Sequence, residues 1–283
     1  MTVAYLNGEF RQLEDIRISP LDRGFLFADG VYEVIPVYAG RLFRADAHLD
    51  RLERSLAGIR MEDPLGRAGW NELLDEIVER NGGGRQAVYL QVTRGAAPRD
   101  HAFPGSIAPT VFAMTRVLEG DPQTAPLHAV TRPDIRWTRC DIKSVALLPN
   151  VLMRQEAQDA SASEAILIRD GMVTEGTATN VFVAQGDAVR TPPQSVHILG
   201  GITRDLLKEL MDAADIDCRE EPITEAELRA AREIWVSSST KEVAPVVRLD
   251  GEPVGEGVPG PLWERIHGLF QDYKQRLMRG DVD

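Results

Sequence analysis

Hydrophobic positions along the chain follow two different periods. Apolar residues recur every three or four positions in five segments, which predicts helices with one buried face over residues 47–59, 70–80, 151–160, 204–214 and 262–277. Short β-rich runs end at turn dipeptides typical of hairpins, namely Asn7-Gly8, Asp170-Gly171, Gly186-Asp187 and Asp250-Gly251. Helices and strands are mixed without strict alternation. The pattern therefore favours an α+β fold over a doubly wound parallel sheet.

The chain is long enough for two domains, since it has 283 residues. A stretch rich in charge, glycine and proline separates an apolar run that ends near Val117 from another that begins near Leu127. We therefore expect an N-terminal domain over residues 1–118, a linker over residues 119–124 and a C-terminal domain over residues 125–283.

Composition and charge narrow the classes of partner. The 32 basic residues are outnumbered by 44 acidic ones, so neither nucleic acid nor an anionic membrane surface is an expected partner. No run approaches the ~20 apolar residues of a membrane-spanning helix, and the first residues lack the pattern of a signal peptide. The two cysteines, Cys140 and Cys218, are too few for a disulfide framework. We expect a reduced, cytoplasmic protein with unpaired thiols.

Lysine is scarce, because only four of the 32 basic residues are lysine: Lys143, Lys208, Lys241 and Lys274. A lysine amine can lose its proton when it is desolvated, which Schiff-base chemistry requires and a guanidinium does not allow. Lys208 and Lys274 lie among charged residues of predicted helices and are predicted on solvated faces. Lys241 follows four hydroxyl residues, as either a loop charge or a phosphate neighbour. Lys143 precedes an apolar run at residues 144–148, as either a catalytic amine or a paired, half-buried cation.

Three further segments combine small and hydroxyl residues. Residues 174–180 place Glu175 among threonines between two predicted strands, either in a ligand site or in a polar turn. Residues 200–203 precede a predicted helix, whose first N–H groups favour an anion such as phosphate; alternatively, Thr203 is only its N-cap. Residues 237–240 either complete the same phosphate site or form a hydroxyl-rich loop. A nucleophilic lysine, an acid for a ring nitrogen and phosphate donors are together the groups that bind pyridoxal phosphate.

These segments resemble the signature blocks of the fold-type IV pyridoxal-phosphate enzymes. That family includes D-amino acid aminotransferases, branched-chain aminotransferases and aminodeoxychorismate lyases. The resemblance is carried by residues 141–144, 174–182 and 201–204, and it runs in order from Tyr5 to about Pro245. It implies a two-domain α+β fold with mixed sheets and flanking helices, a bound pyridoxal 5'-phosphate and a homodimer with active sites at the subunit interface.

The resemblance also implies residue roles. Lys143 corresponds to the lysine that forms the Schiff base with the cofactor and moves the substrate proton, and Glu175 to the acid that keeps the pyridine nitrogen protonated. Arg51, which alone is typical of a solvated helix charge, corresponds to the arginine that binds the phosphate. The other cofactor contacts implied are those of Leu199 with the ring face and of Ile202, Thr203 and Thr240 with the phosphate.

Substrate preference is indicated by Arg99 and His101, two residues apart on a proline-bearing loop. Together they can bind one carboxylate, although the stretch by itself is more typical of a surface loop with two unrelated basic residues. The pair resembles the carboxylate-binding residues of D-amino acid aminotransferases, which reach into the neighbouring subunit and meet the tyrosine matched here by Tyr32. The resemblance thus implies ping-pong transamination of D-amino acids with 2-oxo acids, such as D-alanine with 2-oxoglutarate.

Three alternatives remain open from the sequence. A branched-chain L-amino acid aminotransferase and an aminodeoxychorismate lyase share the same fold, and a lyase eliminates pyruvate instead of passing the amino group on. A non-enzymatic binding module that retains the fold is the third, although Lys143 and Glu175 are both present.

Overall fold

The computed structural model describes residues 2–118, 125–186 and 188–282, and these form two compact units. Unit 1 contains residues 2–118 together with Ile142–Ala146 and residues 276–282. Unit 2 contains residues 125–141 and 147–275. The linker predicted over residues 119–124 lies outside the described residues.

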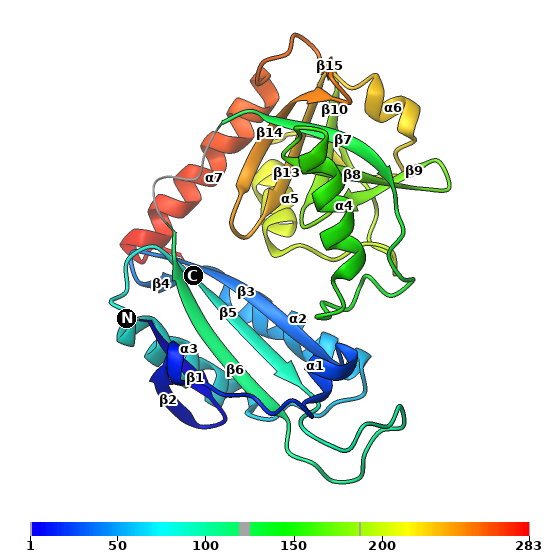
Figure 1. Cartoon of the computed structure of the whole chain (residues 1–283). Helices are drawn as coiled ribbons and strands as arrows, with labels where there is room; N and C mark the ends of the chain where they lie inside the picture. Colours follow the sequence, from blue (N-terminus) through cyan, green and yellow to red (C-terminus); the bar gives the residue numbers. More distant parts are fainter. Residues whose placement is uncertain (1, 119–124, 187, 283) are drawn as a thin grey trace. The chain divides into compact units, whose positions relative to one another are not determined.

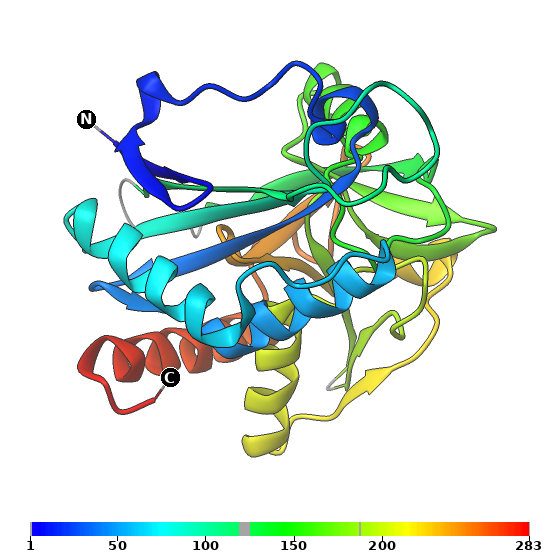
Figure 2. The same cartoon turned by 90° about the horizontal axis from the view of Figure 1, so that it is seen from below.

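Unit 1 is built on an antiparallel sheet. Its elements are β1 (Val3–Leu6), β2 (Glu9–Gln12), the 3-10 helix η1 (Leu13–Asp15), α1 (Arg23–Phe27), β3 (Gly30–Tyr38), β4 (Arg41–Leu42), α2 (Ala45–Gly58), α3 (Gly66–Arg80), β5 (Gln86–Thr93) and β6 (Thr110–Val117). The strand order is β2-β1-β6-β5-β3-β4, and neighbouring strands are antiparallel. Figure 2 shows α2 and α3 lying along one face of this sheet.

The core of unit 1 lies between the sheet and these two helices. Leu52 and Leu56 of α2, and Leu74 and Ile77 of α3, are at most 1% exposed and pack with Ile35 of β3. Their spacing of three or four residues is the helical period seen in the sequence. Burial of each such side chain contributes about 1.5–3 kcal/mol, so this face holds both helices on the sheet.

The segment Ile142–Ala146 belongs to unit 1 because it pairs with the open edge of β3. Strand β4 covers only Val37 and Tyr38, which leaves the first residues of β3 without a strand neighbour on that side. There the Tyr32 N–H donates to the Lys143 carbonyl at 3.0 Å, and the Val145 N–H donates to the Gly30 carbonyl at 3.1 Å. The sequence placed this segment, like residues 276–282, in the C-terminal domain, because long-range pairing leaves no local pattern.

Unit 2 is built on a larger mixed sheet (Figure 1). Its elements are β7 (Leu127–Pro133), α4 (Leu148–Asp159), β8 (Glu164–Arg169), β9 (Met172–Gly176), β10 (Asn180–Gln185), β11 (Ala188–Thr191), α5 (Ile202–Ala213), β12 (Cys218–Glu220), α6 (Glu225–Arg229), β13 (Glu233–Ser238), β14 (Glu242–Leu249), β15 (Glu252–Pro253) and most of α7 (Pro261–Arg279). The strand order is β12-β11-β10-β13-β14-β7-β8-β9, with β15 beside β14. Strand β7 runs parallel to β14 and β8, and α4 packs on β7 and β8.

The predicted fold class and elements are confirmed. The five predicted helices correspond to α2, α3, α4, α5 and α7, and three of the turn dipeptides close the hairpins β1–β2, β8–β9 and β14–β15. Strands β10 and β11 also pair as a hairpin, although Asp187 of their turn lies outside the described residues. Strands and helices mix without regular alternation, so the fold is α+β.

Two details of the helix predictions were wrong. Lys274 is 6% exposed, and its ammonium lies 3.1 and 3.2 Å from the carboxylate oxygens of Glu242. The solvated face predicted for Lys274 fails because its partner comes from β14, far along the chain. Helix α5 begins at Ile202 instead of residue 204. Gly201 is its N-cap, so the alternative that Thr203 caps the helix is not observed.

Two other expectations concern membrane-spanning helices and the cysteine thiols. Among the described residues, no helix has both the length and the apolar character needed to cross a membrane. Cys140 and Cys218 are both free thiols, as expected from their number.

Candidate active site

Lys143 is held by its main chain and lies against an aromatic ring. Besides the pairing with Tyr32, its N–H donates to the Ser55 hydroxyl of α2 at 3.2 Å. Its half-buried ammonium stands 4.3 Å from the centroid of the Tyr32 ring. In the part of the chain that the structure describes, this ammonium has no hydrogen bond or ion pair. A paired cation, one of the two sequence interpretations, is therefore not what is observed.

Arg51 lies in a buried ion pair of unit 1. Its Nε and Nη2 donate to the two carboxylate oxygens of Glu33 at 2.7 and 2.8 Å, and His48 Nδ1 lies 2.7 Å from Glu33. Burial raises the pKa of Glu33, but the charge and hydrogen bonds of Arg51, with His48, hold this pKa well below its usual range. Arg51 is thus not the solvated charge that its helix alone indicated. Its phosphate contact stays a prediction.

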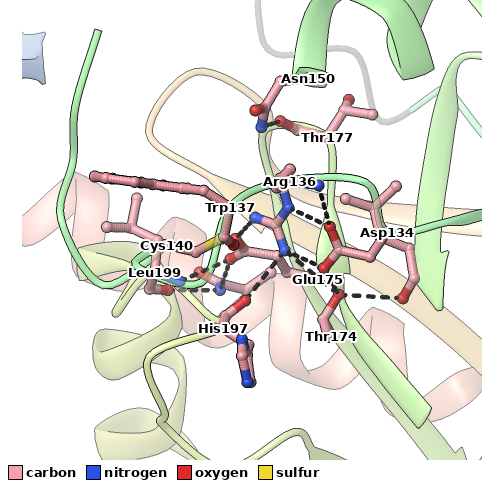
Figure 3. Close-up of polar contacts among 12 residues, drawn as sticks. Asp134, Arg136, Trp137, Cys140, Asn150, Thr174, Glu175, Thr177, His197 and Leu199 are labelled. Carbon is pink, nitrogen blue, oxygen red and sulfur yellow. Dashed lines mark hydrogen bonds and ion pairs between the residues drawn. The ribbon is translucent and has the colours of Figure 1, made fainter. Parts of the chain in front are cut away.

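Glu175 is the centre of a polar cluster in unit 2 (Figure 3). The side chain is buried at the end of β9, and one carboxylate oxygen accepts a hydrogen bond from Arg136. The other oxygen accepts from the Leu199 N–H at 3.0 Å and from the Asn180 amide at 3.3 Å. Burial raises the pKa of Glu175 to about 7, although Arg136 and the Leu199 N–H oppose this shift. At neutral pH the carboxyl group can therefore either hold or release a proton.

Arg136 connects Glu175 to Asp134 (Figure 3). The sequence analysis predicted Glu175 but missed Arg136 and Asp134. Arg136 donates to Asp134 at 2.9 and 2.8 Å and to the His197 carbonyl at 3.1 Å. The Thr174 hydroxyl donates to Asp134 at 3.0 Å. The only trace of these two residues in the sequence is an acid and an arginine two positions apart, shortly before Lys143. Such pairs are common on surfaces, so the pattern did not indicate burial.

The hydroxyl residues after Glu175 bind another buried acid, Glu164. The hydroxyls of Thr177 and Thr179 donate to Glu164, which is 1% exposed. Lys241 also pairs with Glu164, at 3.1 Å from its Oε2. The loop charge or phosphate neighbour considered for Lys241 is thus a partner of this buried carboxylate.

The predicted phosphate residues other than Arg51 lie at the start of helix α5 and after strand β13. Among the residues that the structure describes, no side chain caps the start of α5 at Gly201, so the first N–H groups of the helix remain available to a ligand. Ile202 and Thr203 are buried there, and Leu199 precedes them half-buried. Thr240 lies half-buried in the turn between β13 and β14.

Arg99 and His101 lie together on the loop between β5 and β6, and both are exposed. Tyr32 stacks instead on Tyr89, with ring centroids 5.7 Å apart. Within the described residues, neither Arg99 nor His101 forms a hydrogen bond or ring contact with Tyr32. One chain by itself therefore does not join the three predicted substrate residues.

Comparisons with known proteins place this chain in a family. The family model described as amino-transferase class IV matches residues 30–249. The D-alanine aminotransferase of Bacillus licheniformis is 42% identical over 268 residues, covering 94% of this chain and 95% of that protein. The D-alanine aminotransferase of Staphylococcus haemolyticus is 40% identical over 283 residues, covering 96% of this chain and 98% of that protein.

A solved structure shares the fold. The branched-chain amino acid aminotransferase of T.th., in its structure with pyridoxamine 5'-phosphate, superposes with a TM-score of 0.88 at 25% identity, covering 96% of this chain and 93% of that one. The family match spans most of the chain, and both relatives align over nearly their full length. The chain therefore belongs to the class IV aminotransferase family.

Proposed function

We propose that this chain is a pyridoxal-phosphate-dependent D-amino acid aminotransferase, which moves the amino group of a D-amino acid such as D-alanine to a 2-oxo acid such as 2-oxoglutarate. The observation that carries the proposal is the near full-length identity of 42% and 40% to two D-alanine aminotransferases. The fold shared with an aminotransferase solved with pyridoxamine 5'-phosphate supports the cofactor.

The residues of unit 2 fit this cofactor. Glu175 offers a buried carboxyl group with a pKa of about 7 for the ring nitrogen. The uncapped start of α5 offers N–H groups to the phosphate. The Ser237 hydroxyl is buried without a partner among the described residues, as expected where a ligand supplies the missing contact. When bound, the cofactor supplies an electrophilic carbon and a ring that accepts the electrons of a carbanion.

The residues then have separate tasks. Lys143 binds the cofactor and moves the proton at the substrate Cα, for which its unpaired amine is suited. Arg136 and the Leu199 N–H hold the Glu175 carboxyl group, which would pair with the ring nitrogen of the cofactor. Arg51, Ile202, Thr203 and Thr240 would bind the phosphate, and Leu199 would pack on the ring.

We assign the selection of the D-isomer of the substrate to Arg99 and His101. Binding the α-carboxylate at one end of the site determines which Cα hydrogen faces Lys143, so the position of this pair selects the D-isomer. The pair is exposed and apart from Tyr32, which supports a homodimer in which it serves the partner's site. The two free thiols fit a reducing, cytoplasmic location.

The experiment that tests the function is an absorbance titration of the purified protein. We expect a visible band of bound cofactor that D-alanine bleaches and L-leucine leaves unchanged, and Lys143→Ala should abolish turnover. Bleaching by L-leucine alone would instead assign the chain to the branched-chain aminotransferases. If neither compound bleaches the band, the chain transaminates neither D-alanine nor L-leucine, and the proposed function is wrong.

A further inference from the structure

One aromatic ring contacts both side chains assigned to the substrate carboxylate. The half-buried Phe27, the last residue of α1, lies 5.3 Å from the ring of His101, centroid to centroid. The same ring lies 5.2 Å from the guanidinium carbon of Arg99. Arg99 and His101 are two positions apart, so their side chains can share one side of an extended loop and one supporting surface.

In the described part of the chain, aromatic contacts rather than polar ones hold these two side chains. Within the described residues, neither the Arg99 guanidinium nor the His101 ring has a hydrogen bond or an ion pair. Their nitrogen atoms are therefore available to a ligand, and the Phe27 ring is a contact that both side chains share. A cation over an aromatic face is a directional contact even at an exposed position.

The main chain of the same loop is held by a buried arginine. Arg23 is 3% exposed and ion-paired with Asp29, and it donates to the carbonyls of Asp100 at 2.6 Å, Ala102 at 3.3 Å and His101 at 3.4 Å. The Arg23 guanidinium also lies 4.8 Å from the Phe27 ring. Arg23 thus fixes the backbone, while Phe27 supports the side chains that project from it.

We propose that Phe27 is a positioning residue for substrate specificity: its ring holds Arg99 and His101 in the orientation that binds the substrate carboxylate. This inference rests on the proposed function, because it takes the carboxylate as the ligand of the pair. Side chains that are already oriented lose less conformational freedom when the ligand binds. Phe27 itself touches neither substrate nor cofactor in this scheme.

The test compares Phe27→Leu with Phe27→Tyr and with Phe103→Leu as a matched control. Phe103 is on the same loop, but its ring lies against Arg94 and Arg60. In the holoenzyme, we expect Phe27→Leu to raise the D-alanine concentration for half-maximal bleaching about tenfold, with a much smaller change in the limiting rate. Phe27→Tyr should restore the wild-type value, and Phe103→Leu should remain close to it.

A second readout does not depend on turnover. The chain has five histidines, so a spectrum of protein labelled with ¹³C-histidine is simple, and His101→Gln identifies the His101 signal. That signal should move in Phe27→Leu, because the ring beside it is lost, and stay in Phe103→Leu. An unmoved signal, an unchanged half-maximal concentration, or equal effects of both leucine variants would overturn the proposal. Wild-type protein that ignores D-alanine would refute the proposed function instead, while the histidine signal would still report on the role of Phe27.

Discussion

At the residue scale, Glu175 combines burial with a cation in direct contact. Burial favours the neutral carboxyl group, whereas Arg136 favours the carboxylate, and the resulting pKa of about 7 lies above the ordinary value of 4.5. Arg136 is also paired with Asp134, so its charge is shared between two acids. The negative charge of Asp134 raises the pKa of Glu175 further, which partly offsets the effect of Arg136.

The raised pKa has a consequence for stability. Between pH 4.5 and 7 the folded state binds more protons at Glu175 than the unfolded state, so its contribution to the free energy of unfolding falls as pH rises through this window. We expect the cofactor-free wild type to lose about 2 kcal/mol relative to Glu175→Gln between pH 5 and pH 8. Urea denaturation of both proteins at the two pH values measures this difference. A difference independent of pH would mean that Arg136 keeps Glu175 ionised throughout.

The predictability of single residues depended on where their partners come from. The scarcity of lysine and the apolar run after Lys143 can both be read directly from the sequence, and together they identified Lys143 as a candidate. Lys274 and Arg51, in contrast, lie in helices whose sequence indicates solvated charges, yet each is buried against an acid from a distant strand. A local pattern shows which face of a helix is apolar, but not which carboxylate lies across from a charge.

At the element scale, the start of α5 depends on a glycine. A Cβ at Gly201 would overlap the Asn180 side-chain oxygen, and the Asn180 amide in turn binds the Leu199 carbonyl at 2.9 Å and Glu175 at 3.3 Å. The turn that leads into α5 and the carboxyl group of Glu175 therefore share one asparagine. A side chain at position 201 would disturb both.

Gly201→Ala should therefore weaken cofactor binding and lower the free energy of unfolding by about 1–3 kcal/mol, the usual cost of overpacking. Gly268→Ala in α7 is the matched control, because no atom of the described residues outside its own helix turn lies within 4 Å of the added Cβ. That variant should be slightly more stable than wild type, since alanine favours a helix over glycine. Equilibrium denaturation and titration with cofactor measure both effects. Equal behaviour of the two variants would show that the Asn180 contact does not constrain the turn.

Elements were predicted well where their signal is local. The period of three or four in α2 and α3, and the turn residues of the hairpin at Asn7-Gly8, arise from neighbouring residues. The membership of Ile142–Ala146 in unit 1 arises instead from the short length of β4, which leaves an edge of β3 open. Sheet pairing between distant segments was therefore the part of the fold that the sequence left undetermined.

At the scale of the whole molecule, the proposed function predicts a dimer. Arg99 and His101 are exposed and do not contact Tyr32 within the described residues, whereas Lys143 lies against the Tyr32 ring. In a symmetric dimer, the same surface of each subunit contacts its copy. Arg99 and His101 of each chain can therefore contribute to the site of the other chain. A complete site would then combine Lys143 of one subunit with Arg99 and His101 of its partner.

Hybrid dimers separate this arrangement from a site built within one chain. One subunit carries Lys143→Ala, the other carries Arg99→Ala with His101→Ala, and two different affinity tags allow purification of the hybrid after co-expression. If the pair acts across the interface, one of the two sites combines only unmutated residues, so the hybrid should show about half of the wild-type rate at low D-alanine. If the pair acts within its own chain, both sites are defective, and the hybrid should be no more active than the parent variants. The parent homodimers, purified in the same way, provide the baseline for either result.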